Sequence, residues 1–221
     1  MPDEPLAEVA ATITVTEPPS VSMIHFWALQ TSFMVGETKV GAGHFGLQFH
    51  PDYPGDGAVN WGGYATSGDQ LEGSTSDLPS ARSNINTRNY DWEPNRPYKY
   101  RIYQAPGSRY DWRGSVTDMV SGVETVVRDL HVQADSLRHP MVWSEVFAHC
   151  DHPSHAVRWS DFEALSVAGD IIRPASVKLS YQTFEKGGCG NTNILPGAIA
   201  GSVVQRTNTA RTNVAGSHLV L

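Results

Sequence analysis

Three consecutive runs of alternating apolar and polar residues, at 141–150, 156–165 and 177–184, constrain the fold of this chain more than any other feature. In a β-strand, successive side chains point to opposite faces of the sheet. The first run therefore places Val142 and Val146 on one face and Trp143 and Glu145 on the other. The aliphatic face is typical of a core. The opposite face, with rings and a carboxylate, is more typical of a binding surface.

Similar runs occur at 23–33, 39–50, 58–66, 98–104, 111–119 and 122–133. The chain also contains 20 glycines and 14 prolines, which suits many short strands joined by tight turns. The first three of these runs are expected to form a meander. Together the runs predict an all-β protein, a two-sheet antiparallel sandwich with little helix.

The expected organisation is one β-sandwich domain over residues 21–186, with a segment at each end. Residues 1–20 are interpreted as an N-terminal arm that includes an edge-like strand at 11–16. Residues 187–221 are rich in Gly, Asn, Thr and Ser and are interpreted as a C-terminal tail with little regular structure. Residues 67–97 are too long and too polar for an ordinary connection, which makes them a candidate functional loop.

Charge and hydropathy exclude several classes of partner. The net charge of -7 argues against nucleic acid, which is bound mainly through clustered Lys and Arg. No run reaches the ~18 apolar residues that span a bilayer, so no membrane span is expected. Residues 1–5 lack the basic and apolar regions of an export leader. The expected location is nevertheless extracellular or on a particle surface.

The two cysteines, Cys150 and Cys189, are expected to lie within bridging reach, because one ends a central strand and the other follows the last core strand. Two buried free thiols are the alternative, since pairing cannot be deduced from sequence. A bridge would indicate an oxidising compartment.

Five short motifs appear in a suggestive order, and each is weak alone: Gly46-Leu47-Gln48, Val59-Asn60-Trp61-Gly62, Tyr98-Lys99-Tyr100-Arg101-Ile102, Trp112-Arg113-Gly114-Ser115-Val116 and Trp143-Ser144-Glu145-Val146-Phe147. Their order over roughly residues 40–185 resembles a family of bacterial secreted domains of unknown function. The resemblance implies a concanavalin-like jelly roll whose concave face could bind carbohydrate. This chain departs from that pattern in its opening residues and in its long Thr/Asn-rich tail.

The leading functional hypothesis is a non-catalytic carbohydrate-binding sandwich whose partner is a polysaccharide or other glycan. Sugars stack their CH faces on aromatic rings and bond their hydroxyls to amides, carboxylates and guanidinium groups. Trp143 and Tyr103 would supply the stacking surfaces. The full set of predicted ligand-binding residues is His44, Gln48, Asn60, Arg101, Tyr103, Trp143, Glu145 and Gln182.

Two other functions stay open. The first is a coat, fibre or other assembly protein whose terminal segments dock on further copies of the chain. The second is a glycan-cleaving enzyme that uses Glu145, for which the sequence shows no evident carboxylate partner. Metal ligands could gather at residues 149–155, and Asp52 and Asp56 could hold calcium, but the spacing is poor in the first case. No metal and no cofactor are expected.

Overall fold

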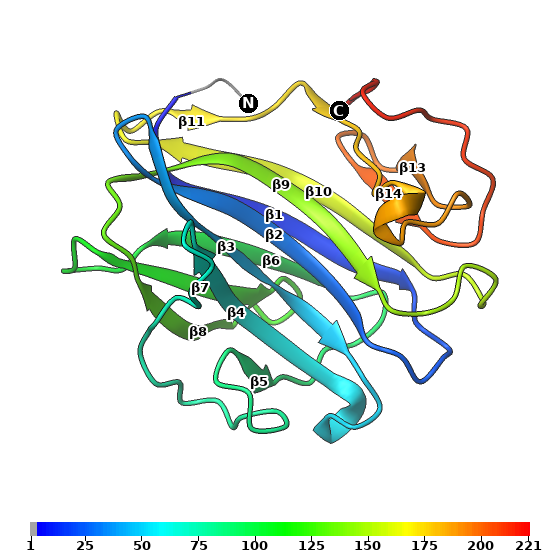
Figure 1. Ribbon diagram of the computed structural model, residues 1–221, viewed down its shortest axis with the longest axis horizontal. Coiled ribbons are helices and arrows are strands. Elements are labelled where there is room, and N and C mark those ends of the chain that lie inside the picture. The colour runs from blue at the N-terminus through cyan, green and yellow to red at the C-terminus, as the bar shows by residue number, and fades with distance from the viewer. Residues whose placement is uncertain (1–3) are drawn as a thin grey trace.

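The computed structural model describes residues 4–221 and consists almost entirely of strands (Figure 1). The first eight strands are β1 Leu6–Glu17, β2 His25–Val35, β3 Thr38–Phe49, β4 Gly57–Ala65, β5 Thr87–Asn89, β6 Pro97–Gln104, β7 Asp111–Asp118 and β8 Glu124–His131. The others are β9 Ser136–Val146, β10 Ala156–Ser166, β11 Ile171–Ile172, β12 Ser176–Lys178, β13 Asn193–Pro196, β14 Val203–Arg206 and β15 His218–Val220. The helical elements described are two 3-10 turns, Pro54–Asp56 and Phe184–Lys186.

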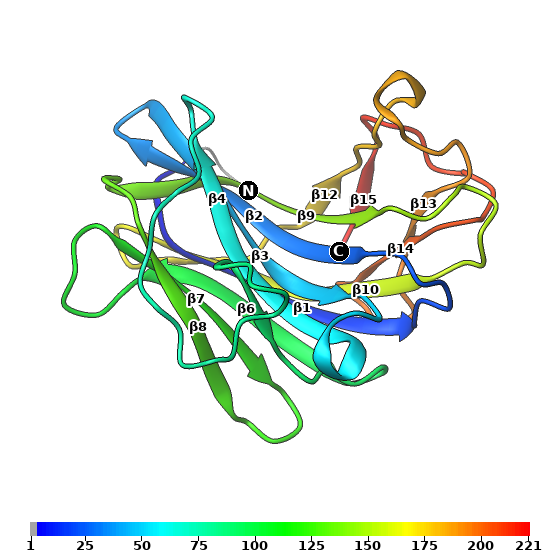
Figure 2. The ribbon, with the colours of Figure 1, turned by 60° about the horizontal axis from the view of Figure 1, so that its bottom comes forward.

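The strands form two antiparallel layers, which confirms the predicted sandwich. One layer has the order β5-β4-β3-β2-β9, and the other has the order β13-β14-β10-β1-β6-β7-β8. The layers join where Leu6 of β1 pairs with Leu137 of β9. Strands β12 and β15 form a separate small sheet beside one end of the first layer (Figures 1 and 2).

Strand alternation produces the core between the layers. Trp27, Leu47 and Trp61 come from the first layer, and Tyr100 and Trp159 from the second; all five are fully buried. Two hydrogen bonds cross the core as well. The Leu47 N–H donates to the Tyr100 hydroxyl at 2.8 Å, and the Trp61 Nε1 donates to the Trp112 carbonyl at 3.0 Å. The hydroxyl of a buried Tyr and the indole N–H of a buried Trp usually have a hydrogen-bond partner. Here the partners lie in the opposite layer, so the two bonds help to fix the spacing of the layers.

Three local predictions differ from the structure. The expected edge strand near the N-terminus is β1, which is paired on both sides, to β10 and to β6. The run at 141–150 belongs to β9, which starts at Ser136 and ends at Val146, so that Cys150 lies in a loop. The run at 177–184 contributes only the short β12. In addition to these three differences, residues 187–221, which the sequence pattern predicts to be a tail with little regular structure, contain three short strands, β13, β14 and β15.

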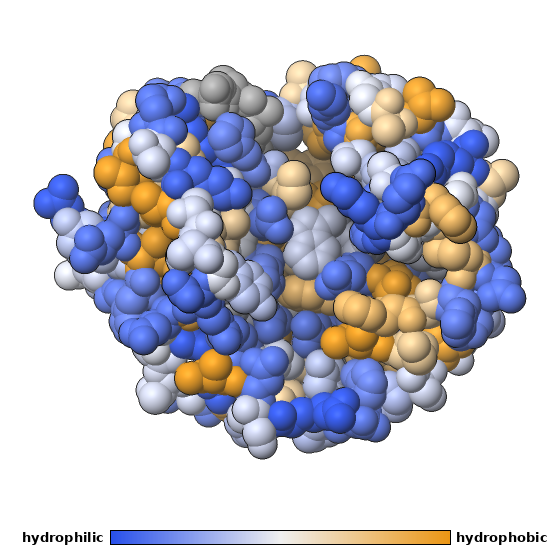
Figure 3. Space-filling model, viewed as in Figure 1, coloured by the Kyte–Doolittle hydropathy of each residue, from blue (hydrophilic) through white to orange (hydrophobic). Residues whose placement is uncertain are grey.

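The outer face of the first layer is concave. In Figure 2 the first layer is bent, and it rises to the β2–β3 hairpin at one end and faces the segment from β12 to β15 at the other. Figure 3 shows the same face hollowed along its middle. Among residues 4–221, no helix has the length and apolar character required to cross a membrane.

Candidate functional site

A row of three residues crosses the concave face at right angles to the strands. Phe26 of β2 is paired with Gln48 of β3 on one side and with Glu145 of β9 on the other. Residues directly opposite one another in a sheet point to the same face. The backbones of Gln48 and Glu145 are separated by two strand spacings, roughly 10 Å. Two long polar side chains therefore stand on either side of one apolar ring.

The Gln48 side chain is buried and held in one orientation. The Tyr53 hydroxyl donates to Gln48 Oε1 at 3.0 Å, and the Trp92 Nε1 donates to the Gln48 main-chain carbonyl at 2.9 Å. Tyr53 belongs to a small buried cluster with Ala58 and Ala81, which covers this end of the row. Because Oε1 is occupied, the Nε2 amide is the group that remains to donate a hydrogen bond to a ligand.

Glu145 is exposed on the groove side, yet its surroundings still disfavour the charged form. Partial burial raises the pKa of its carboxyl above the ordinary range for glutamate. Within residues 4–221, no hydrogen bond or ion pair to this carboxylate is present to oppose that shift. Glu145 can therefore exchange a proton closer to neutral pH than a solvated glutamate can.

Three rings, those of Phe26, His44 and Trp143, cluster on the same face. The Trp143 ring meets Phe26 edge to face at 5.0 Å between centroids, and His44 meets Phe26 at 5.7 Å. Trp143 is only partly buried, and its Nε1 donates to Gln30 Oε1 at 3.1 Å. Burial lowers the pKa of His44, so its imidazole is neutral near pH 7. Together these rings form a platform of flat side chains that includes Phe26 of the Gln48–Phe26–Glu145 row.

The structure brings four of the predicted ligand-binding residues together: His44, Gln48, Trp143 and Glu145. Asn60 lies on the same face, but it is buried, and its Nδ2 donates to Oγ1 of Thr87, the paired residue on the neighbouring strand β5, at 2.9 Å. Two residues that the sequence did not single out, Phe26 and Gln30, belong to this site. The alternation at 23–33 was the available signal, because it places both on one face of β2.

Arg101 and Tyr103 are corrections to the predicted set. They lie on β6, in the other layer, and point away from the core on the opposite side of the sandwich. Arg101 is bonded to Glu8 at 2.7 Å and stacks over the Tyr103 ring at 4.3 Å. Gln182 is a further correction, since it lies in the loop after β12 rather than on the sheet.

A cavity of about 1200 Å³ adjoins the row on the outer side of β9. One wall is β9 and the loop that follows it, including Trp143 and Glu145, and the opposite wall is formed by residues between 174 and 194. Gln182 lines this cavity and so shares it with Glu145. The space exceeds the roughly 300–1,000 Å³ of ordinary small-molecule pockets and is large enough for a segment of chain.

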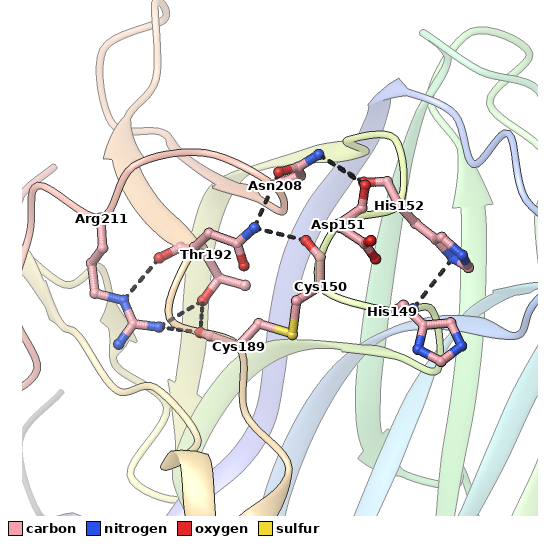
Figure 4. The surroundings of a disulfide bond; sticks show 9 residues. His149, Cys150, Asp151, His152, Cys189, Thr192, Asn208 and Arg211 are labelled. Carbon is pink, nitrogen blue, oxygen red and sulfur yellow. Dashed lines mark hydrogen bonds between the residues drawn. A yellow bond between two sulfur atoms is a disulfide. The ribbon is translucent and has the colours of Figure 1, made fainter.

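A disulfide bond holds the two walls together; the sequence predicted that the two cysteines lie within bridging reach and left the bond itself open. Cys150 and Cys189 are bonded, with their Cα atoms 5.5 Å apart. Asn191 Nδ2 donates to the Cys150 carbonyl at 2.7 Å, and Arg211 Nη2 donates to the Cys189 carbonyl at 2.7 Å (Figure 4). The two walls of the cavity are therefore joined by one covalent bond and by these hydrogen bonds.

The two candidate metal sites have other contacts. His149 and His152 approach one another, with ring centroids 4.9 Å apart, and Nδ1 of His152 accepts from the His149 N–H. Asp52 forms an ion pair with Arg82 at 3.0 Å. No group of three or more His, Cys, Asp or Glu residues is placed to hold a metal ion within residues 4–221.

Comparison with known proteins gives a fold and no family. No protein family matches the sequence, and no curated protein matches it. Among solved structures, SCP-B, a member of the eqolisin family of peptidases in complex with the tripeptide Ala-Ile-His, has a TM-score of 0.50 at 11% identity over 94% of each chain. Scytalido-glutamic peptidase with a transition-state analogue inhibitor has a TM-score of 0.48 at 12% identity, covering 91% of this chain and 92% of that one. Its complex with a peptide-based analogue also scores 0.48, at 11% identity, covering 93% and 94%.

The prediction of a non-catalytic carbohydrate-binding protein was wrong. The solved structures named above are peptidases, and the predicted set of sugar ligands is divided between the two outer faces of the sandwich. This comparison does not test the two alternatives, an assembly protein and a glycan-cleaving enzyme. At 11% identity, the shared feature is the β-sandwich itself.

Proposed function

We propose that this protein is a peptidase, with Glu145 as the proton-transferring carboxyl group and Gln48 as the hydrogen-bond donor to the reacting carbonyl. The observation that carries the proposal is the row on the concave face, where these side chains stand on either side of Phe26. A peptide group lying over Phe26 is within reach of both. The peptidase fold of SCP-B, whose structure contains a bound tripeptide, supports the choice of substrate.

The reaction balances with these two residues and one water. The ionised Glu145 takes a proton from the water as its oxygen bonds to the peptide carbonyl carbon. Gln48 Nε2 donates to the oxygen that becomes negative, an interaction that acts most strongly in the transition state. Protonated Glu145 then gives its proton to the peptide nitrogen as the carbon–nitrogen bond breaks. The products are a carboxylic acid and an amine, and Glu145 returns to its ionised form.

The environment of Glu145 suits both halves of this cycle. A group that serves as base and then as acid works best when its pKa lies near the pH of the medium. Partial burial raises the pKa of Glu145 in that direction. The rings of Phe26 and Trp143, which pack against each other, lie on the same face of the sheet as this carboxyl.

The test is hydrolysis of a mixed library of internally quenched octapeptides. Glu145→Gln should lower kcat/KM on the order of 10²–10⁴-fold, the usual contribution of a general acid–base group. The matched control is Glu72→Gln, which makes the same change at an exposed position on the 67–97 segment. Equal activity in the Glu145→Gln variant and in the wild type would refute the role of Glu145, and no hydrolysis by the wild type at any pH would refute the function.

We also propose that the protein works in an oxidising compartment such as the extracellular space. The Cys150–Cys189 bond supports this, because disulfides persist mainly outside the reducing cytosol.

A further inference from the structure

The cavity beside β9 continues the line of the Gln48–Phe26–Glu145 row. The row crosses β3, β2 and β9 in register, and the next position outward is the cavity rather than another strand. Over most of its length, β9 has a partner strand only in β2, since its pairing with β1 is confined to Leu137. The layer therefore stops at β9 and leaves a slot between this strand and the segment from β12 to β13.

Gln205 of β14 stabilises the open edge of β9 at the bottom of this slot. Its Nε2 donates to the Val142 carbonyl at 3.3 Å. Its Oε1 accepts from Ser144 Oγ at 2.6 Å and from Trp159 Nε1 at 3.0 Å. One side chain thus takes the place of part of a neighbouring strand. The slot is therefore more than a packing gap. At its bottom, a backbone carbonyl on the unpaired edge of β9 has a hydrogen-bond partner from β14.

The slot combines apolar side chains with polar and charged ones, such as Glu145, Lys178 and His155. Its lining includes Phe162, Val177, Leu179, Ile194 and Val203 from β10, from the segment around β12 and from β13 and β14. These residues surround space on several sides, and the disulfide holds the far wall in place. Apolar side chains that leave water for such a space contribute favourably to binding, in proportion to the area they bury.

The distance from Phe26 to the slot shows how many substrate residues separate the slot from the bond that is cut. An extended chain advances about 3.3 Å per residue, and the slot lies two strand spacings, roughly 10 Å, from a peptide group over Phe26. A substrate laid across the strands therefore reaches the slot about three residues from the bond that is cut. Dipeptides and tripeptides are too short to place a side chain there on their own.

We infer that the slot beside β9 is a substrate subsite for apolar side chains about three residues from the scissile bond. This inference rests on the proposed peptidase function and makes the enzyme an endopeptidase for extended polypeptides. Such a subsite distinguishes substrates by how much apolar surface of one side chain it buries. A substrate with an apolar side chain at this position should have a kcat/KM about 10-fold or more above that of a substrate with a polar one. The residues that decide the preference are Val177 and its neighbours in the lining.

Binding tests the subsite without turnover. The probes are three fluorescein-labelled octapeptides with a central Gly-Gly pair: one with three leucines before the pair, one with three leucines after it, and one with serines at all outer positions. Titrated into the Glu145→Gln protein, at least one leucine peptide should bind about 10-fold more tightly than the serine peptide.

A matched pair of variants locates the effect. Val177→Trp fills the slot and should remove the leucine preference, whereas Val220→Trp on the same small sheet lies outside the lining and should preserve it. Equal Kd values for all three peptides, or a preference that survives Val177→Trp in protein with an unchanged melting temperature, would overturn the subsite. A leucine preference in a protein that never cleaves peptides would uphold the subsite and remove the peptidase.

Discussion

At the scale of single residues, the orientation of Gln48 depends on Tyr53. Tyr53 donates to Gln48 Oε1, so the amide cannot rotate to present its oxygen to the substrate carbonyl without losing that bond. Tyr53 does not touch the reacting atoms in the proposed reaction and acts through Gln48 as a positioning residue.

Tyr53→Phe should therefore lower kcat while leaving KM nearly unchanged, because the lost bond matters most when Gln48 stabilises the transition state. We expect a fall of about 10-fold in steady-state peptide hydrolysis. A purely structural effect would instead lower the melting temperature and the fraction of active enzyme, with kcat per active site unchanged. The Gln48→Ala variant should lose more, on the order of 10²-fold.

The pH dependence of hydrolysis should reveal Glu145. As the base, it must be ionised, so kcat/KM rises with pH as the carboxyl loses its proton. Burial raises the pKa of Glu145, so the rise should lie above the ~4.3 of an unperturbed glutamate. Measured from pH 3 to pH 9, kcat/KM of the wild type should show this rise. The residual activity of Glu145→Gln should not show it. A rise at or below the ordinary glutamate value would contradict the shift.

His155 should make the fold sensitive to acid. Burial, together with the nearby His25, lowers its pKa to about 3. The rings lie 4.8 Å apart, and the Nδ1 of His155 is engaged with Thr207 Oγ1 at 2.9 Å. The folded state therefore favours neutral His155, while the unfolded chain binds a proton below its ordinary pKa of about 6.5. Stability is complete above that value and is lost as the pH falls toward 3.

Urea unfolding at a series of pH values measures this loss. Each fully linked proton costs about 1.4 kcal/mol per pH unit. His155→Gln, which keeps a polar side chain beside Thr207, should reduce the slope of unfolding free energy against pH between 6 and 4. An unchanged slope would show that other groups cause the acid sensitivity.

At the scale of elements, the disulfide ties the loop after β9 to the segment that forms the far wall of the slot. It closes a loop across a sequence separation of 39, worth about 3–4 kcal/mol in the loop-entropy description. The bonds from Asn191 and Arg211 reinforce the same junction.

Replacing both cysteines by serine should lower the unfolding free energy by about 2–4 kcal/mol. It should also weaken the preference for leucine peptides, because the far wall is then held by fewer contacts. Thermal melts and the peptide titrations measure the two effects on one protein. A destabilised variant with the full leucine preference would show that the wall is fixed without the bond.

Alternation along the chain predicted the strands and their buried faces well. It placed His44 and Gln48 together on β3, and Trp143 and Glu145 together on β9, because period two is a local property of an extended chain. It could not assign Arg101, since alternation shows which face of its own strand a residue occupies and not which layer the strand joins. The central place of β1 was missed for the same reason: its partners are far away in sequence.

At the scale of the whole molecule, the titrations of Glu145 and of the buried histidines both disfavour acidic pH. In the proposed reaction Glu145 must lose its proton to act, and burial raises its pKa, so hydrolysis should decline as the medium becomes acidic. Burial lowers the pKa of both His25 and His155, so stability also declines there. In a continuous peptide assay, hydrolysis should therefore fall as the medium is made acidic. Undiminished hydrolysis below pH 4 would contradict the raised pKa of Glu145.

The pairing of β1 also determines when the chain can fold during its synthesis. Residues 6–17 find their hydrogen-bonding partners in β6 and in β10, which ends at Ser166. A contact of such long range must wait until the later strand is available, and it makes folding slow. On the ribosome, the first strand remains without one neighbour until three quarters of the chain has emerged, while the β2–β3–β4 meander can form early. A fragment of residues 1–150 should thus lack cooperative thermal unfolding by circular dichroism, and a sharp transition in that fragment would show that β1 needs no distant partner.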